Sequence, residues 1–220
     1  MHDPVLPPVA PAVRPQSATS ARPLPDARSS VSGWLLSGGQ GRRMGGHDKG
    51  LVPMHDGQAM AWHAAQRLAP QVATLTLNVN RNAQAYASLG WPVQADATDL
   101  PQGFGPLAGM LTGLRQATTP WVQFAPCDYP KLPSDLVIRL WHAAATHGAE
   151  VAVPITQQGG ETWHHWTCAL TSCSTAGALS ESVNAGNHRV RMWLTAQRWI
   201  GVCFDDAEAF QNINTLGDLR

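Results

Sequence analysis

Apolar positions along this chain follow two alternating spacings from about residue 33 onward. Short apolar or alternating runs, which are typical of buried strands, occupy residues 34–36, 75–79, 121–125 and 151–153. Apolar residues spaced i, i+3, i+4 and i+7 predict amphipathic helices over residues 107–114 and 136–144. This alternation predicts an α/β fold: a three-layer, Rossmann-like, mostly parallel sheet with helices on both faces.

The first 31 residues follow neither spacing. They contain seven of the chain's 17 prolines, mixed with alanine, serine and arginine. Such a segment buries little apolar surface and loses helix to its prolines. We therefore expect residues 1–31 to form a disordered tail, with a targeting peptide or a docking tail as alternatives, and residues 32–220 to form a single domain.

Composition narrows the class of function. The 15 basic and 15 acidic side chains give a net charge of zero, so no overall basic field favours nucleic acid as a partner. The four cysteines form no Cys-x-x-Cys pair, and no His-Glu-x-x-His motif supports zinc hydrolysis. The sequence has neither an apolar run long enough to span a membrane nor an apolar signal core, which predicts a cytoplasmic protein.

The stretch from Leu36 to Leu51 is built like a phosphate-binding loop. It follows the strand at 34–36 and holds six glycines, two arginines and one lysine in sixteen positions. Glycines allow backbone N–H groups to approach an anion, and cations supply charge beside phosphate oxygens. The backbone grip is assigned to Gly38, Gly39 and Gly41, and the charge to Arg43 and Lys49. The stretch lacks the Walker pattern, because Gly50 follows Lys49, and a flexible surface turn is the alternative.

Asp128 is the candidate metal ligand. It follows the strand at 121–125 and stands between Pro126 and Pro130, which restrict the backbone that carries its carboxylate. Mg²⁺ favours one or two carboxylates together with phosphate oxygens and water. Lys49 and Asp128 both follow strands, so the rule for parallel sheets predicts that they meet at the carboxyl edge, on exposed loops. A turn-forming aspartate is the alternative interpretation.

Five motifs in the same order resemble the nucleotidyltransferases that act on the molybdenum cofactor, and most closely the molybdenum cofactor guanylyltransferase family. They are Leu36–Leu51, Asn78–Arg81, Gly105–Leu111, Pro126–Pro130 and Asn212–Thr215. Ser37 stands where the family pattern usually has alanine. The resemblance implies the nucleotidyltransferase fold and a Mg²⁺-dependent transfer of GMP from GTP to the terminal phosphate of molybdopterin, with pyrophosphate released.

The resemblance also assigns residues to the substrates. It implies that GTP is bound at Leu36, Ser37, Gly38, Lys49, Asn78 and Asp96. The chemistry of the loop adds Gly39 and Gly41 to the GTP-binding residues, and the metal position adds Asp128. The resemblance assigns the metal to Asp128. The catalytic roles of Lys49, Asp128 and Arg43 follow from the positive charge and the metal that transfer from a triphosphate requires. Asp96 could accept hydrogen bonds from the N1 and N2 donors of guanine, although Asp99, three residues on, is easily confused with it.

The C-terminal half is assigned to the acceptor by the same resemblance. Asn212 and Asn214 match residues that contact the pterin, and Arg189 matches one that could meet its phosphate. In Trp163–Thr167, Trp166 replaces the proline that usually follows histidine in the family, which weakens the acceptor assignment. Proteins that mature molybdenum enzymes are possible partners, whereas nucleic acid and membranes are not expected.

Three alternative functions stay open at the level of sequence. The loop also suits a cytidylyltransferase for the same acceptor or a sugar-phosphate nucleotidyltransferase, and a non-catalytic adaptor could bind and deliver the cofactor.

The small residues of Gly105–Gly109 are explained equally well by close approach of a ligand to a helix N-terminus and by tight packing of the helix on the sheet.

Overall fold

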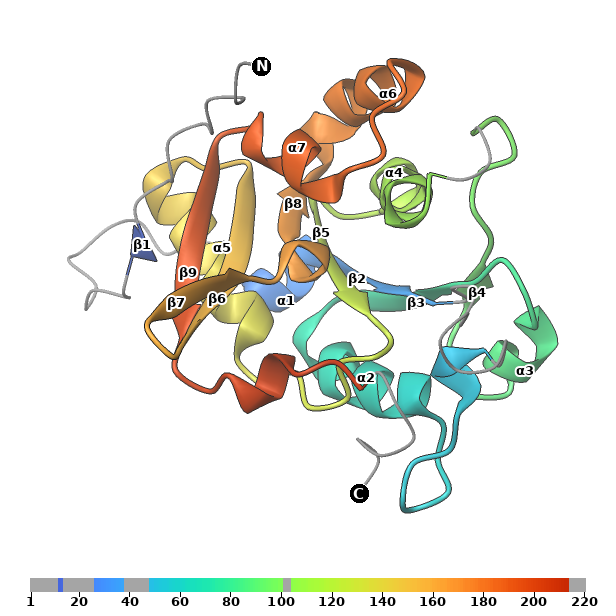
Figure 1. The fold of residues 1–220 in the computed structure, drawn as a ribbon. Coiled ribbons are helices and arrows are strands. Elements are labelled where there is room, and N and C mark those ends of the chain that lie inside the picture. The colour runs from blue at the N-terminus through green and yellow to red at the C-terminus, as the bar shows by residue number, and fades with distance from the viewer. Residues whose placement is uncertain (1–11, 14–25, 38–47, 101–103, 214–220) are drawn as a thin grey trace, which may run out of the picture.

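Nine strands form one sheet in the computed structural model, which describes residues 12–13, 26–37, 48–100 and 104–213 (Figure 1). The order across the sheet is β1-β9-β6-β8-β5-β2-β3-β4, with β7 paired to β6. The strands are β1 Ala12–Val13, β2 Val31–Leu36, β3 Thr74–Asn78, β4 Val93–Gln94, β5 Trp121–Pro126, β6 Val151–Gln158, β7 Glu161–His164, β8 Leu170–Ser172 and β9 Trp199–Phe204.

Most neighbouring strands run parallel, as predicted. β2 pairs in parallel with β3 and with β5, β3 with β4, and β9 with β1 and with β6. The antiparallel pairs are made by β8, which lies between β5 and β6, and by β7, which forms a hairpin with β6. The hairpin and the short β8 carry no periodicity that distinguishes their direction, so the sequence did not predict them.

Helices cover both faces of the sheet and complete three layers (Figure 1). The helices are α1 Ala27–Ser30, α2 Met60–Leu68, α3 Ala83–Ala87, α4 Pro106–Gln116, α5 Leu136–His147, α6 Ala176–Asn184 and α7 Val190–Thr195. Strand side chains alternate between the faces. Leu35 of β2 belongs to the core cluster that contains residues of α2 and α5, and Trp34 belongs to the cluster that contains residues of α4, α6 and α7. The predicted three-layer fold is therefore confirmed. No helix in the described ranges has the length and apolarity needed to cross a bilayer.

The folded domain begins before residue 32, which corrects the predicted boundary. Asp26 caps α1 through a side-chain hydrogen bond from the backbone N of Arg28 (3.1 Å), and Ala27 is buried. Val31 is the first residue of β2 and is also buried. In addition, β1 at residues 12–13 extends the sheet beside β9. The prolines on which the tail was predicted stop at residue 25, but the predicted tail was extended to residue 31.

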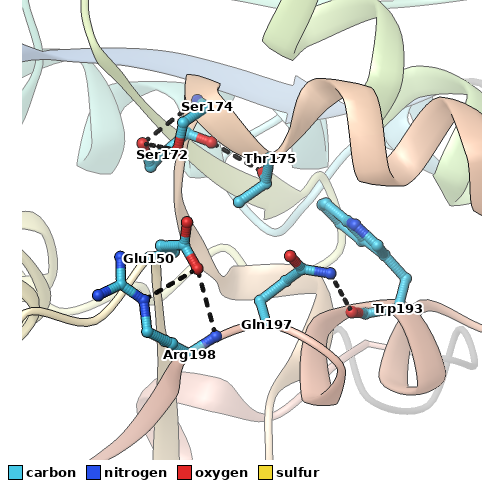
Figure 2. Close-up of polar contacts among 7 residues, drawn as sticks. All are labelled: Glu150, Ser172, Ser174, Thr175, Trp193, Gln197 and Arg198. Carbon is cyan, nitrogen blue, oxygen red and sulfur yellow. Dashed lines mark hydrogen bonds and ion pairs between the residues drawn. The ribbon is translucent and has the colours of Figure 1, made fainter.

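Local polar contacts hold α6 and α7 to the sheet (Figure 2). Ser172 ends β8 and accepts a hydrogen bond from the backbone N of Ser174 (3.3 Å), while Thr175 Oγ1 donates to the Ser172 carbonyl (2.8 Å). After α7, an ion pair joins Arg198 to Glu150 at the starts of β9 and β6 (3.3 Å). The two helices that flank the predicted acceptor segment are therefore fixed at the ends that meet the sheet.

Candidate active site

The carboxyl ends of β2, β3 and β5 meet at one edge of the sheet. Leu36 is in register with Asn78 on one side and with Pro126 on the other. Two backbone hydrogen bonds extend the pairing past the strands, from Ser37 N to the Asn78 carbonyl (2.9 Å) and from Cys127 N to the Leu36 carbonyl (3.0 Å). The predicted convergence of the two loops on one edge is thus confirmed.

Lys49 and Asp128 form an ion pair at this edge. Lys49 Nζ lies 2.7 Å from Asp128 Oδ2, although the residues are 79 positions apart in sequence. Their side chains are only 18% and 20% exposed, so the expectation of exposed loops is wrong. The pair is half-buried because the 3-10 turn η2 (Lys49–Leu51) packs against α2 and places the buried Gly50 beside Cys127.

The chain beside Asp128 is itself well packed. Burial and the neighbouring Asp128 carboxylate raise the pKa of the Cys127 thiol to about 12, so Cys127 is a protonated packing residue rather than a nucleophile. Burial likewise raises the pKa of Tyr129 well above its usual range. Asp128 thus lies between a buried cysteine and a half-buried tyrosine in a packed segment.

Asp128 fits a magnesium site of the kind that phosphate completes. Its Oδ2 accepts from Lys49, and its Oδ1 accepts no hydrogen bond from the described residues. Within the described ranges, no three His, Cys, Asp or Glu side chains gather into a metal-binding cluster. One carboxylate is nonetheless a sufficient protein ligand for Mg²⁺ when nucleotide oxygens and waters supply the rest.

Asp96 belongs to the same edge, and Asp99 does not. Asn78 Nδ2 donates to Asp96 Oδ1 (2.9 Å), and Asn80 Nδ2 donates to Asp96 Oδ2 (2.8 Å). Asp99 is turned toward α4, where it pairs with Arg115 (2.9 Å). The structure therefore separates two aspartates that the sequence left ambiguous.

Asn78 is buried and closely packed between β4 and α4. Its Nδ2 also donates to the Gln94 carbonyl (3.2 Å), and Gly109 of α4 lies so near its Oδ1 that a Cβ at residue 109 would collide with it. The Asn78 amide thus has two roles: it bonds to the backbone of β4, as an amide at a strand end commonly does, and it orients the Asp96 carboxylate. The same close approach shows that Gly109 is required for packing of α4 on the sheet.

The C-terminal segment brings Asn212 to Asp128. The backbone N of Ile213 donates to the Asp128 carbonyl (3.1 Å), and the side chain of Ile213 is buried. Asn212 is exposed next to this anchor. A residue assigned to the acceptor is therefore beside the candidate metal ligand.

Arg189 lies elsewhere, at the start of α7. Its backbone N donates to Asn187 Oδ1 (3.0 Å), and the neighbouring His188 stacks on Phe104 just before α4, with 4.2 Å between ring centroids. Among the described residues, Arg189 forms no hydrogen bond or ion pair with Asp128 or Asn212. The structure thus places Arg189 beside the segment that opens α4 rather than beside the Lys49–Asp128 pair.

The adjacent histidines serve two separate clusters. His165 is hydrogen-bonded to Thr156 (3.0 Å) and stacks on Phe210, and burial, aided by His164, lowers its pKa to about 4. His164 stacks on Trp166, with 4.8 Å between ring centroids. Trp166, which replaces the usual proline, therefore belongs to an aromatic cluster with His164 and Trp199.

Several predicted site residues lie outside the described ranges. These are Gly38, Gly39, Gly41, Arg43 and Asn214. Conversely, sequence reasoning gave no role to Asp48, Tyr86, Asn82 or Asn80, which the structure connects to the site. A charged residue directly before Lys49 was the available signal for Asp48. Tyr86 gave none, because 38 residues separate it from Asp48.

Comparison with known proteins finds relatives that match most of the chain. Residues 33–200 match the family described as MobA-like NTP transferase domain. A protein of Cupriavidus taiwanensis named molybdenum cofactor guanylyltransferase is 48% identical over 195 residues, covering 88% of this chain and 96% of its own length. A protein of the same name from Bordetella pertussis is 39% identical, covering 88% of this chain and 96% of its own length.

Two solved structures share the fold. Molybdopterin-guanine dinucleotide biosynthesis protein A from Archaeoglobus fulgidus has a TM-score of 0.68 at 20% identity, over 86% of this chain and 94% of its own. CMP:2-keto-3-deoxy-manno-octonic acid synthetase complexed with CTP has a TM-score of 0.66 at 12% identity, over 87% of this chain and 95% of its own. At these identities the likeness supports the fold alone.

Proposed function

This chain belongs to the MobA-like NTP transferase domain family, and we propose that it transfers GMP from GTP to the terminal phosphate of molybdopterin. A phosphate oxygen of the acceptor attacks the α-phosphorus of GTP. The new bond joins that oxygen to the α-phosphorus, and the bond to the β-phosphate breaks to release pyrophosphate. The products are the guanine dinucleotide form of the cofactor and pyrophosphate.

The observation that carries this proposal is the ion pair between Lys49 and Asp128 at the carboxyl edge of the sheet. Nucleotidyl transfer concentrates negative charge on the phosphates, so a cation and a metal-holding carboxylate at one point are what the reaction needs. The acceptor phosphate is already ionised near neutral pH. The reaction therefore requires no strong general base.

The residues of the edge divide the work of binding GTP. Lys49 would meet the phosphates as a compact positive charge, together with Gly38, Gly39, Gly41 and Arg43 of the loop. Leu36 and Ser37 would border the nucleotide, and Asp96, oriented by Asn78, would accept hydrogen bonds from guanine or the metal shell. Asp128 would hold Mg²⁺, and the ion when bound supplies further positive charge to the phosphates.

The acceptor would lie where the C-terminal segment meets Asp128. Anchoring of Ile213 to the Asp128 carbonyl supports contact between the pterin and Asn212, with Asn214 two residues further on. The resemblance assigns Arg189, which precedes α7, to the acceptor phosphate, and this contact stays a prediction because Arg189 is not beside the Lys49–Asp128 pair. The product would pass to proteins that mature molybdenum enzymes.

A nucleotide comparison tests the function. The purified chain is incubated with Mg²⁺, molybdopterin and each of the four nucleoside triphosphates, and pyrophosphate release is measured with and without acceptor. We expect release with GTP that depends on the acceptor. Efficient use of CTP without GTP would identify a cytidylyltransferase, and tight binding of the cofactor without pyrophosphate from any nucleotide would identify a delivery adaptor.

A further inference from the structure

Asp48 is a buried carboxylate to which the proposed transfer reaction assigns no role. It directly precedes Lys49, is only 9% exposed, and has no ion pair with any described residue. Instead, its Oδ1 accepts a hydrogen bond from Tyr86 Oη (2.6 Å), and its Oδ2 accepts from Asn82 Nδ2 (3.1 Å). A buried charge is costly unless its hydrogen bonds are made, so both contacts matter for keeping Asp48 in place.

The two donors come from one short helix at the neighbouring strand end. Tyr86 is fully buried in α3, and Asn82 caps that helix in the left-handed conformation, with φ +57°. The residues after β3 therefore hold Asp48, which directly precedes η2. Sequence separates the partners by 34 and 38 residues, so the bonds are tertiary contacts rather than local turn bonds.

Gly50 shows how closely Tyr86 approaches the turn. A Cβ at residue 50 would collide with the Tyr86 hydroxyl and would lie 3.2 Å from Cys127 Sγ. The hydroxyl thus lies between Asp48 and Gly50, the two neighbours of Lys49. Cys127 closes the other side of the turn and is itself the neighbour of Asp128.

We infer that Asp48 and Tyr86 are positioning residues that fix η2, so that Lys49 Nζ is held against Asp128. This inference rests on the proposed role of Lys49 in nucleotide transfer. A lysine side chain has four rotatable bonds, and a free one would sample many positions. Anchoring the backbone on both sides of Lys49 confines its ammonium group to the point where the phosphates are expected.

Removal of one hydroxyl tests the inference. In Tyr86→Phe, we expect kcat with GTP to fall about 10-fold while KM for molybdopterin stays within about twofold. Asp48→Asn, which keeps the shape and removes the charge, should act in the same direction. Asp99→Asn is the matched control, because it removes a carboxylate from an exposed ion pair with Arg115 and should leave kcat unchanged.

A double-mutant cycle separates positioning from general damage. If Tyr86 acts through Lys49, adding Tyr86→Phe to Lys49→Met should cause no further loss of kcat. Losses that multiply in the double variant, or a full kcat in folded Tyr86→Phe, would overturn the inference. Thermal unfolding of each variant verifies that the folded protein is compared.

Chemical labelling gives a readout that does not need catalysis. Lys49 and the exposed Lys131 are the chain's two lysines, so an amine-acylating reagent followed by mass spectrometry compares them within one molecule. We expect Lys49 to react several-fold faster in Tyr86→Phe, with Lys131 unchanged. An unchanged Lys49 rate would refute the positioning role even if turnover proved absent, whereas a faster rate without turnover in the natural chain would refute only the proposed function.

Discussion

Lys49 and Asp128 depend on each other in the protein without nucleotide. Lys49 Nζ and Asp128 Oδ2 are 2.7 Å apart, and both side chains are about one-fifth exposed. Each side chain therefore neutralises the half-buried charge of the other. Such a pair adds little net stability, but removing one partner leaves the other charge uncompensated. The pair should therefore influence both turnover and folding.

Replacing Lys49 tests both effects. We expect Lys49→Met to slow guanylyl transfer by roughly 10²-fold or more, because a charge that stabilises the transition state is removed. The free energy of unfolding should fall by about 1 kcal/mol, because Asp128 loses its donor. Turnover assays and urea unfolding measure the two quantities. Lys131→Met, at an exposed lysine three residues after Asp128, should change neither, and near-normal turnover of Lys49→Met would exclude Lys49 from catalysis.

At the scale of elements, α4 packs directly against the ends of β2 and β3 at the site. Pro106 occupies its first turn as predicted, and Gly105 precedes it at φ +54°. The sequence left two explanations open for the small residues at the start of this helix: close approach of a ligand, or tight packing of the helix on the sheet. Gly109 lies against Asn78, and Gly113 lies against Trp34 and Phe124. These two glycines therefore allow the helix to pack closely on the sheet.

Three glycine-to-alanine variants separate packing from binding. Gly109→Ala forces a methyl group onto Asn78, so we expect stability to fall by about 1–3 kcal/mol and KM for GTP to rise as Asp96 shifts. Gly113→Ala meets Trp34 and Phe124 at 2.9 Å and should lose similar stability with KM unchanged. Gly177→Ala in α6 meets nothing within 4 Å and should gain about 0.5–1 kcal/mol. Chemical denaturation and GTP titration measure these changes, and an unaltered KM in Gly109→Ala would separate Asn78 from nucleotide binding.

At the scale of the whole molecule, the periodicity of the chain predicted the parallel strands and the amphipathic helices. It also predicted the meeting of residue 49 with residue 128, because parallel strands place their carboxyl ends at one edge. The antiparallel β8 and the β6–β7 hairpin were missed, since short buried strands look alike whichever way they run. Contacts such as Tyr86–Asp48 and Asn80–Asp96 were missed because they depend on how loops fold over that edge.

A half-buried histidine, His165, makes the stability of the whole domain sensitive to acid. His165 lies between Phe210 and Tyr129 and is hydrogen-bonded to Thr156. Its pKa is lowered from 6.5 to about 4 by burial and by the nearby His164. Between these two pH values the unfolded chain binds a proton that the folded chain does not, so stability falls as the pH falls.

We expect this histidine to remove about 1–2 kcal/mol of stability between pH 6.5 and pH 4, a figure reduced for its partial exposure. More than about one pH unit above 6.5 it should contribute little pH dependence, because the histidine is then neutral in both states. His165→Gln keeps a polar partner for Thr156 but cannot titrate, so its free energy of unfolding should change less over this range. Urea unfolding at half-unit steps of pH measures the difference between the two proteins. Parallel curves for the natural chain and the variant would show that His165 titrates alike in the folded and unfolded states.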